Sequence, residues 1–382
     1  IYLDNSATTR PYRGVTNLVA DVMYNSYGNP SSLHRRGMEA EKLIKTAREN
    51  IAQTLRVHPK EIYFTSGGTE ADNMAIMGLA TANRGGHILS TPIEHPAVMN
   101  TLKYMESLGY TVEFLPVDSR GLAEVEALER MLRPDTVLVT CMYVNNEIGT
   151  IQPVSEMAQI IKRKNPNTMF HIDAVQAYCK IPFTAASCGA DAITLSSHKI
   201  HGPKGMGALY VKGKTKISPV SFGGGQQDNL RPGTENVAGI AGFGLAARHC
   251  HSKMRESLPQ MEYLRDRLKS GILAHIPNVK INTPERIAAP HILNVSFGGV
   301  RSEVLLHSLE LDEIYVSSGS ACSSHKKGPS YVLTAIGLEN TWIDGSIRFS
   351  LSEFTTRQEI DTVIEALTQI VPKLRRVSGY KG

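Results

Sequence analysis

The sequence predicts an α/β protein in which a mostly parallel sheet is wrapped by helices and is followed by a smaller α+β unit. From about residue 60 to 211, short apolar segments alternate with helical stretches, which is the order of a parallel sheet with crossover helices. Beyond about residue 255 the pattern changes to a long helix, a few strand-like segments and a final helix. The 382 residues, 41% of them hydrophobic, suffice for two such units.

The first region holds seven short apolar strand candidates. They are residues 61–64, 87–90, 111–115, 136–140, 169–172, 192–195 and 208–211. Between them, helical patterns run over residues 70–83 and 154–164. Ligands of such sheets bind at the carboxyl ends of the strands, so we expect a site among the polar residues that follow them.

The second region begins with a long amphipathic helix whose apolar stripe is formed by Leu258, Met261, Leu264, Leu268 and Ile272. Strand candidates follow at residues 292–297, 314–316 and 346–351. A last helix is predicted to start at the capping box of Thr356 and Glu359. Its apolar face carries Ile360, Val363, Ile364, Leu367 and Ile370.

These patterns divide the chain into two expected domains. Residues 13–255 would form the large domain, and residues 1–12 together with 256–382 would form the small α+β domain. We expect the N-terminal segment to pack with the small unit.

Composition argues against several classes of function. The net charge of +5 is small for this length, and no dense basic block stands out beyond the tail, so we expect no direct binding of nucleic acid. No run of about 18 or more apolar residues exists, so we expect no membrane span.

The five cysteines are scattered. They are Cys141, Cys179, Cys188, Cys250 and Cys322, too few for a disulfide framework, and no CxxC pair indicates zinc. The run His249-Cys250-His251 is expected to be helical, where consecutive side chains point in different directions and cannot converge on one metal. A cytoplasmic location fits this cysteine usage best.

The segment Phe64-Thr-Ser-Gly67-Gly68-Thr69-Glu70 is a strand end, a glycine turn and a helix start. Free amides at such a turn, together with the helix dipole, bind phosphate, and the Thr69 hydroxyl adds a donor. It matches neither a P-loop nor a GxGxxG fingerprint, which weakens a nucleotide interpretation. An ordinary N-capped turn is the alternative.

Two further strand ends carry ionisable side chains. Asp173 follows the strand candidate 169–172, and a buried carboxylate there needs a cationic partner. That partner could be a pyridinium nitrogen, an arginine or a helix N-terminus. His95 follows the strand candidate 87–90, where an imidazole can stack on a flat cofactor or shuttle protons, although a loop histidine is the usual case.

The segment Ser196-Ser197-His198-Lys199 follows the strand candidate 192–195 and places an amine among hydroxyls and an imidazole. A lysine held there can lose its proton near neutral pH and form an imine with a carbonyl cofactor. From this segment alone, a surface lysine at a strand end is the commoner outcome. Together with the phosphate turn, Asp173 and His95, it predicts a site for pyridoxal 5'-phosphate.

Two residues in the second region are candidates for a nucleophile and for a substrate-binding group. Cys322 lies in a run of small residues beside His325, Lys326 and Lys327, and nearby cations favour the nucleophilic thiolate. Arg348 lies within an otherwise apolar strand candidate and needs a carboxylate, either a structural one or that of an amino-acid substrate. We favour the substrate.

These residues occur in motifs that resemble those of the cysteine desulfurases of the NifS/IscS type over nearly the whole chain. The motifs are Tyr2-Leu-Asp-Asn-Ser-Ala-Thr-Thr9, Tyr27-Gly-Asn-Pro-Ser31, Thr91-Pro-Ile-Glu-His95, Asn145-Asn-Glu-Ile-Gly149, His171-Ile-Asp-Ala-Val-Gln176, Ser197-His-Lys199, Ser317-Ser-Gly-Ser-Ala-Cys322 and Ile347-Arg-Phe-Ser-Leu351. The resemblance implies a homodimeric, fold-type I pyridoxal-phosphate enzyme that converts L-cysteine to L-alanine and passes the sulfur, as a persulfide, to an acceptor protein for iron–sulfur cluster assembly or tRNA thiolation.

The resemblance also implies a role for each residue. Lys199 would bind the cofactor covalently and move the Cα proton, and Cys322 would attack the substrate sulfur. The implied cofactor-binding residues are Gly68, Thr69, His95, Asn145, Asp173, Gln176, Ser196, His198, Lys199 and Thr234 of the partner subunit. The implied substrate-binding residues are Asn5, Asn145 and Arg348, and no metal is implied.

Other functions on the same fold stay open at this point. They are a selenocysteine lyase, an aminotransferase, and a non-catalytic sulfur-carrier or scaffold-binding protein. Intact Lys199, Asp173 and Cys322 argue against the last of these.

Overall fold

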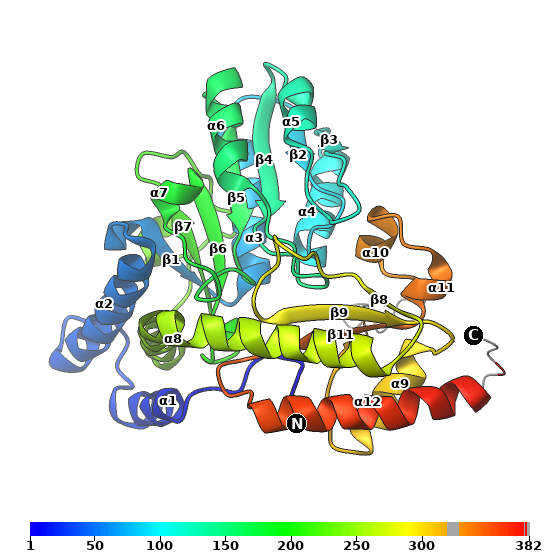
Figure 1. Cartoon of the computed structure of the whole chain (residues 1–382). Helices are drawn as coiled ribbons and strands as arrows, with labels where there is room; N and C mark the ends of the chain where they lie inside the picture. Colours follow the sequence, from blue (N-terminus) through cyan, green and yellow to red (C-terminus); the bar gives the residue numbers. More distant parts are fainter. Residues whose placement is uncertain (319–327, 378, 380–382) are drawn as a thin grey trace.

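The computed structural model describes residues 1–318, 328–377 and 379 (Figure 1). It contains a seven-stranded sheet and a separate four-stranded sheet. None of the helices in these residue ranges is long and apolar enough to cross a membrane.

The large sheet has the strand order β1-β7-β6-β5-β4-β2-β3. Neighbours from β6 to β3 run parallel, whereas β7 is antiparallel to both β6 and β1. The bounds are β1 (Ile62–Thr65), β2 (His87–Ser90), β3 (Thr111–Phe114), β4 (Thr136–Met142), β5 (Met169–Asp173), β6 (Ala192–Ser196) and β7 (Gly207–Val211). All seven predicted strands are therefore confirmed, and the second has the predicted bounds.

Helices cover both faces of this sheet, as the alternating pattern predicted. On one face, α3 (Gly68–Ala82) and α4 (Pro96–Ser107) enclose one apolar cluster. The larger cluster on the other face includes residues of α2 (Arg35–Leu55), α6 (Val154–Lys164) and α8 (Val237–His275). The remaining short elements of this region are α1 (Arg13–Asn25), η1 (Pro59–Glu61), α5 (Val125–Met131), α7 (Ala185–Cys188), η2 (Ser197–Lys199) and η3 (Gln226–Asn229).

The small sheet is antiparallel, with the strand order β10-β11-β9-β8. Apolar side chains of α8, α9 and α12 bury it in a second large cluster. The capping box is present: Thr356 Oγ1 accepts from the amide of Glu359, whose carboxylate accepts from the amide of Thr356. The bounds are β8 (Val279–Ile281), β9 (Ile292–Phe297), α9 (Ser302–Glu310), β10 (Ser317–Ser318), α10 (Tyr331–Ala335), α11 (Asn340–Ile343), β11 (Ser346–Ser350) and α12 (Arg357–Val377).

One predicted strand is wrong. Residues 314–316 form only a bridge between Tyr315 and Tyr2, and β10 begins at Ser317. The reason is that Tyr315 pairs with the N-terminal segment, through hydrogen bonds to Ile1 and Leu3, rather than with the small sheet. Asp4 forms a similar bridge to Ser350. The N-terminal segment therefore packs with the small unit, as expected.

Helix α8 is longer than predicted, because its 39 residues run from Val237 through the segment 249–251 to His275. Its first half packs so closely on α2 that a Cβ at Gly244 would lie 2.4 Å from the Cα atom of Ala47. The glycine and alanine residues needed for this contact hide the helical pattern there. The division expected at residues 255 and 256 falls inside this continuous helix and stays a prediction (Figure 1).

Candidate active site

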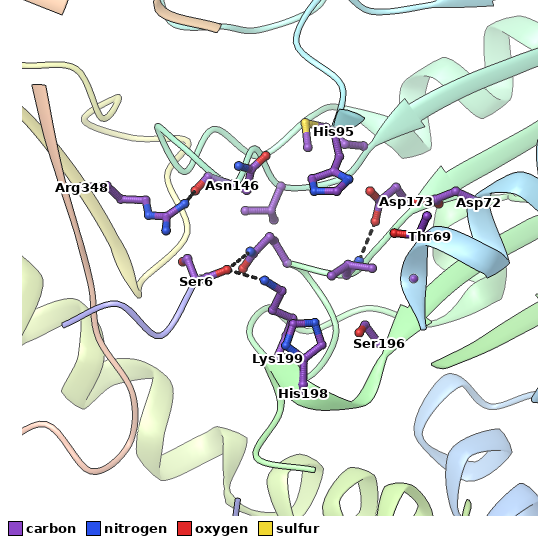
Figure 2. A pocket seen from close by; sticks show the side chains of 15 residues that line it. Ser6, Thr69, Asp72, His95, Asn146, Asp173, Ser196, His198, Lys199 and Arg348 are labelled. Carbon is purple, nitrogen blue, oxygen red and sulfur yellow. Dashed lines mark hydrogen bonds between the residues drawn. The ribbon is translucent and has the colours of Figure 1, made fainter. Parts of the chain in front are cut away.

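A cavity of about 170 Å³ lies beyond the carboxyl ends of β4, β5 and β6 and the N-terminus of α3 (Figure 2). It brings together nine of the residues predicted from the sequence, although they span positions 68 to 348. The lining consists of Ser6, Gly68, Thr69, Asp72, His95, Met142, Val144, Asn146, Asp173, Val175, Gln176, Ser196, His198, Lys199 and Arg348. Parallel strands end at one edge of a sheet, which is why side chains from separate motifs meet there.

The glycine turn forms one end of the cavity. α3 begins at Gly68, and the first amides of a helix lack partners within the helix, so they face the cavity as donors. A Cβ at Gly68 would lie 2.9 Å from Cγ2 of Val175, so a larger residue at this position would displace either the turn or the valine side chain. The Ser196 hydroxyl, also in the lining, is buried and has no hydrogen-bond partner within the described part of the chain. The amides and this hydroxyl together suit an anion such as phosphate.

Asp173 ends β5, and its Oδ1 accepts a 2.9 Å hydrogen bond from the amide of Val175 (Figure 2). Burial raises the pKa of this carboxyl to about 6, while the Val175 amide and the charge of Lys199 oppose the shift. A cationic ring nitrogen placed against it would favour the ionised form.

A second carboxyl, Asp72 on α3, lines the same end of the cavity and was not predicted from the sequence. Burial, and then the charge of Asp173, raise its pKa well above the usual value, while a hydrogen bond with Thr194 opposes the shift. His171 lies 3.7 Å from the Asp72 carboxyl but does not neutralise it, because burial lowers the pKa of His171 to about 3. Both nitrogens of this imidazole bond instead to Thr140 and Thr194.

His95 caps α4: its Nδ1 accepts a 3.1 Å hydrogen bond from the amide of Ala97. This bond fixes the ring over the cavity and places the proton of the neutral ring on Nε2. Burial, helped by the charge of Lys199, lowers the pKa of His95 to about 4. The imidazole is therefore uncharged and suited to stack on a flat ring.

Lys199 lies at the end of η2, where its Nζ donates hydrogen bonds of 2.6 Å to the carbonyl oxygens of Ser6 and Ala7. Gln176 donates from Nε2 to the same Ser6 oxygen, at 2.8 Å, and its Oε1 is buried without a partner in the described residues. His198, whose pKa burial lowers to about 4, contacts the hydroxyl of Thr8 through Nδ1 at 3.2 Å. The N-terminal segment thus crosses in front of the amine.

Arg348 occupies the centre of β11 and enters the cavity from the small sheet (Figure 2). Its Nη1 donates to the carbonyl oxygen of Asn146 at 2.9 Å, and its Nη2 to Asp4 Oδ1 at 2.8 Å. The Nε atom is buried and has no hydrogen-bond partner among the described residues. This guanidinium therefore retains a donor for a carboxylate.

Other expected site residues are not brought into the cavity. The Asn145 amide donates to Ile93 O, and its Oδ1 accepts from the amides of the next turn, so Asn146 lines the cavity instead. Asn5 donates to the carbonyls of Tyr2 and Ser350. Thr234 is exposed, and Cys322 lies outside the described residues.

Sequence reasoning missed Ser6, Asp72 and Asn146. Asp72 gave a signal, because it is an acidic residue past the first turn of a largely apolar helix and so needed an explanation. Ser6 and Asn146 gave no such signal. Each directly follows an asparagine, Asn5 or Asn145, to which the resemblance assigned the role instead.

Comparison with known proteins agrees with this geometry. The aminotransferase class-V family model matches residues 1–363. A cysteine desulfurase of Nostoc sp. is 44% identical over 382 residues, which are 100% of this chain and 95% of that protein. The cysteine desulfurase IscS of Dictyoglomus turgidum is 41% identical over 383 residues, covering 100% of this chain and 97% of that protein.

Among solved structures, a NifS-like protein superposes with a TM-score of 0.92 at 40% identity. The alignment covers 98% of this chain and 100% of that one. The fold is therefore that of the fold-type I pyridoxal-phosphate enzymes, as the resemblance implied. The chain belongs to the class-V aminotransferase family and, within it, to the cysteine desulfurases of the NifS/IscS type.

Proposed function

We propose that this chain binds pyridoxal 5'-phosphate in the cavity of Lys199 and catalyses the reaction that names its family. L-Cysteine and the thiol of Cys322 would give L-alanine and a persulfide on Cys322. The observation that carries the proposal is the convergence of an amine, a neutral imidazole, a buried carboxyl and a guanidinium on one cavity, from Lys199, His95, Asp173 and Arg348.

The residues present fit the cofactor. The amides of Gly68 and Thr69, with the unpartnered Ser196 hydroxyl, would hold the phosphate, and His198 lies beside them. Asp173 would face the ring nitrogen. Two further ring contacts are available: the imidazole of His95, which would stack, and the Gln176 amide, which would bind the ring oxygen.

When bound, the cofactor supplies an aldehyde for covalent attachment of an amine and a ring that withdraws electrons from the substrate Cα. The protein supplies the remaining groups. The amine of Lys199 would be the point of covalent attachment. It would then move the proton at the substrate Cα. Arg348 would bind the substrate carboxylate through its unpartnered Nε, with Asn146 beside it in place of the expected Asn145 and Asn5.

Cys322 would attack the sulfur atom of the substrate. The sulfur–sulfur bond forms as the carbon–sulfur bond breaks, the electron pair stays on the substrate side, and a proton on that carbon completes L-alanine. Ser317, the first residue of the strand that leads toward Cys322, pairs with Arg348 in the small sheet. This register supports a cysteine segment that starts beside the substrate carboxylate site.

The surface supports a homodimer. Near the end of α1 and the start of α2, five large apolar side chains are exposed, and Phe222 is a sixth. They are Met23, Tyr24, Tyr27, Leu33 and Met38. A partner subunit on this surface would bury them, and it would explain why Thr234, implied to serve the other active site, is exposed.

The sulfur acceptor would be a protein that reaches the persulfide, such as an iron–sulfur scaffold or a thiolation protein. A reducing cytoplasm suits this chemistry, since a persulfide exchanges with thiols. Of the cysteines that the structure describes, Cys141, Cys179, Cys188 and Cys250 are all unpaired thiols.

The test is the stoichiometry of the reaction. Purified protein loaded with pyridoxal 5'-phosphate is given L-cysteine and a thiol reductant, and L-alanine and sulfide are measured together. Equal amounts of both products are expected. Selenide release from L-selenocysteine without action on L-cysteine would replace the proposal with a selenocysteine lyase. Turnover that requires a 2-oxo acid would indicate an aminotransferase, and a loaded protein without turnover would indicate a carrier.

A further inference from the structure

The loop of residues 226–235 is hydrogen-bonded to the glycine turn that begins α3. Arg231 in this loop donates to the carboxylate of Glu70, the third residue of α3, at 2.9 Å from Nε to Oε1 and 3.4 Å from Nη2 to Oε2. The same carboxylate accepts a hydrogen bond from the amide of Ser66 in the turn. Each side chain of the ion pair is only 27% exposed, so solvent screens it less than a surface pair.

Other contacts of the loop hold Arg231 in this position. The buried side chain of Gln227 accepts hydrogen bonds at Oε1 from the amide of Phe64 in β1, at 3.0 Å, and from Arg48, at 3.1 Å. Leu230 belongs to the apolar cluster that contains α3. Gln227 and the two residues after it have positive φ angles of 49°, 55° and 64°. Such a backbone persists in residues other than glycine only where surrounding contacts enforce it, so the fold itself determines the course of this loop.

The charge of Glu70 opposes the proposed use of the turn. A phosphate ester carries a charge of about −1.5 to −2 near pH 7, and Glu70 directly follows Thr69, whose amide would bind it. Burial alone would raise the pKa of Glu70, but hydrogen bonds from Arg231 and Ser66 lower it, so the carboxylate is ionised near pH 7. An ionised carboxylate in the first turn stabilises the helix, yet it would repel a phosphate bound to the same turn. The guanidinium of Arg231 supplies the compensating charge.

We propose that Arg231 is a positioning residue for the cofactor phosphate. It neutralises Glu70, so the turn keeps its capping carboxylate without repelling the phosphate, and it fixes the turn in which the amides of Gly68 and Thr69 lie. Arg231 is absent from the described lining of the active-site cavity, so it would act through Glu70 rather than by contact with the cofactor. The effect of Arg231 should therefore depend on the phosphate charge and disappear when Glu70 is made neutral. This inference rests on the proposed binding of pyridoxal 5'-phosphate.

The experiment measures binding rather than turnover. Dissociation constants of pyridoxal phosphate and of pyridoxal, which lacks the phosphate, are determined by fluorescence titration of the cofactor-free protein. Arg231→Gln should bind pyridoxal phosphate about tenfold more weakly, because it leaves the charge of Glu70 uncompensated. Its affinity for pyridoxal should stay within about twofold of the wild type, since no phosphate is present to be repelled. The double variant with Arg231→Gln and Glu70→Gln should recover the wild-type affinity for pyridoxal phosphate to within about threefold.

Two single variants complete the comparison. Glu70→Gln keeps an oxygen that can accept from the Ser66 amide but carries no charge, so it should bind pyridoxal phosphate at least as tightly as the wild type. Arg163→Gln is the matched control, because Arg163 forms an ion pair with Glu129 at 3.2 Å on the surface and contacts no part of the glycine turn. Its affinities for both ligands should be those of the wild type.

Three results would overturn the proposal. The first is an unchanged affinity of Arg231→Gln for pyridoxal phosphate. The second is an equal loss for pyridoxal, which would show that packing rather than charge is responsible. The third is a double variant that binds as weakly as Arg231→Gln alone. If Arg231→Gln does not fold, as judged by circular dichroism, Glu70→Gln decides: weaker binding of pyridoxal phosphate than in the wild type would contradict the proposal.

The same titrations separate this inference from the proposed function. A wild type that binds pyridoxal phosphate no more tightly than pyridoxal would refute both the role of Arg231 and the proposed cofactor site. The expected pattern of affinities in a protein that does not desulfurate L-cysteine would refute only the proposed reaction.

Discussion

Nζ of Lys199 donates a 2.6 Å hydrogen bond to the carbonyl oxygen of Ser6, a residue 193 positions earlier in the chain. The side chain of Gln176 donates to the same oxygen. The N-terminal segment is itself held by bridges to the small unit, at Tyr315 and at Ser350 of β11. One carbonyl group thus links the amine on the large sheet to the small unit that carries Arg348.

Lys199 is expected to be the site of covalent attachment. After borohydride reduction of the loaded protein, mass spectrometry should find pyridoxal phosphate on the peptide of Lys199. Lys199→Ala should lose the attachment entirely, because no other amine in the described lining of the active-site cavity can replace it. The control is Lys204→Ala, an exposed lysine five residues further on, which should keep it. Attachment to Lys204 would refute the assignment.

Cys322→Ser is expected to keep the cofactor but to release sulfide from L-cysteine about a thousandfold more slowly, since serine cannot accept the sulfur atom. Sulfide production and cofactor content are measured on the same preparation. Cys188→Ser, at a buried thiol that is not part of the cavity lining, should stay within a few-fold of the wild type in sulfide release per bound cofactor. Normal turnover by the Cys322 variant would exclude the persulfide step.

Arg348→Lys should raise KM for L-cysteine by about 10- to 100-fold, because one ammonium cannot keep the hydrogen bonds to Asn146 and Asp4 and also supply the donor that Nε offers to a carboxylate. Cofactor affinity, measured by fluorescence titration, should change much less. Arg267→Lys is the matched change at the α8–α12 surface, where Arg267 pairs with Asp361 at 2.6 Å. Its KM should be that of the wild type. Equal losses of cofactor and substrate affinity in Arg348→Lys would instead indicate a structural role.

The two carboxyls at the ring-nitrogen end of the cavity should respond differently to the same substitution. Asp173→Asn removes the charge offered to the ring nitrogen and should weaken cofactor binding about 10- to 100-fold. Burial and the charge of Asp173 raise the pKa of Asp72, which disfavours its ionised form, so Asp72→Asn should change the affinity by only a few-fold. Equilibrium binding of pyridoxal phosphate to both variants checks this contrast. A larger loss in Asp72→Asn would show that Asp72 carries the charge.

Glu94 should make the cofactor-free protein less stable as the pH rises. Burial raises the pKa of Glu94 to about 8, and the unfolded chain has the ordinary value near 4.3. Between these values the native state binds the extra proton, so this contribution to the unfolding free energy falls by up to about 1.4 kcal/mol per pH unit. Urea unfolding at pH 6.5 and 8.0 is compared with Glu94→Gln, which lacks the titrating group.

The wild type should lose more stability than Glu94→Gln over this interval. The histidines of the site do not interfere, because their lowered pKa values affect stability mainly below about pH 6.5. Glu303→Gln on exposed α9 should run parallel to the wild type. Parallel curves for Glu94→Gln and the wild type would show that Glu94 is ionised in the native state.

The strands of the large sheet could be predicted because each is a short buried segment that lies between helices. Their bounds differ from the prediction by at most two residues at either end. The prediction of a strand at 314–316 was wrong, because Tyr315 forms only a bridge to the N-terminal segment and no local pattern encodes a contact over 300 residues. The first half of α8 was missed since its small residues serve close packing rather than an apolar stripe.

The sequence by itself determined the types of reactive group and their places at strand ends, because both are local properties of the chain. It therefore predicted Lys199, Asp173 and His95, which the structure brings together in the lining of one cavity. The tertiary structure alone decided which neighbours those groups have. It placed Asn146 rather than Asn145 in the cavity lining, and it brought the buried carboxyl of Asp72 to the same cavity as Asp173. Electrostatic effects depend on distance and burial, and these quantities exist only once remote segments have packed together.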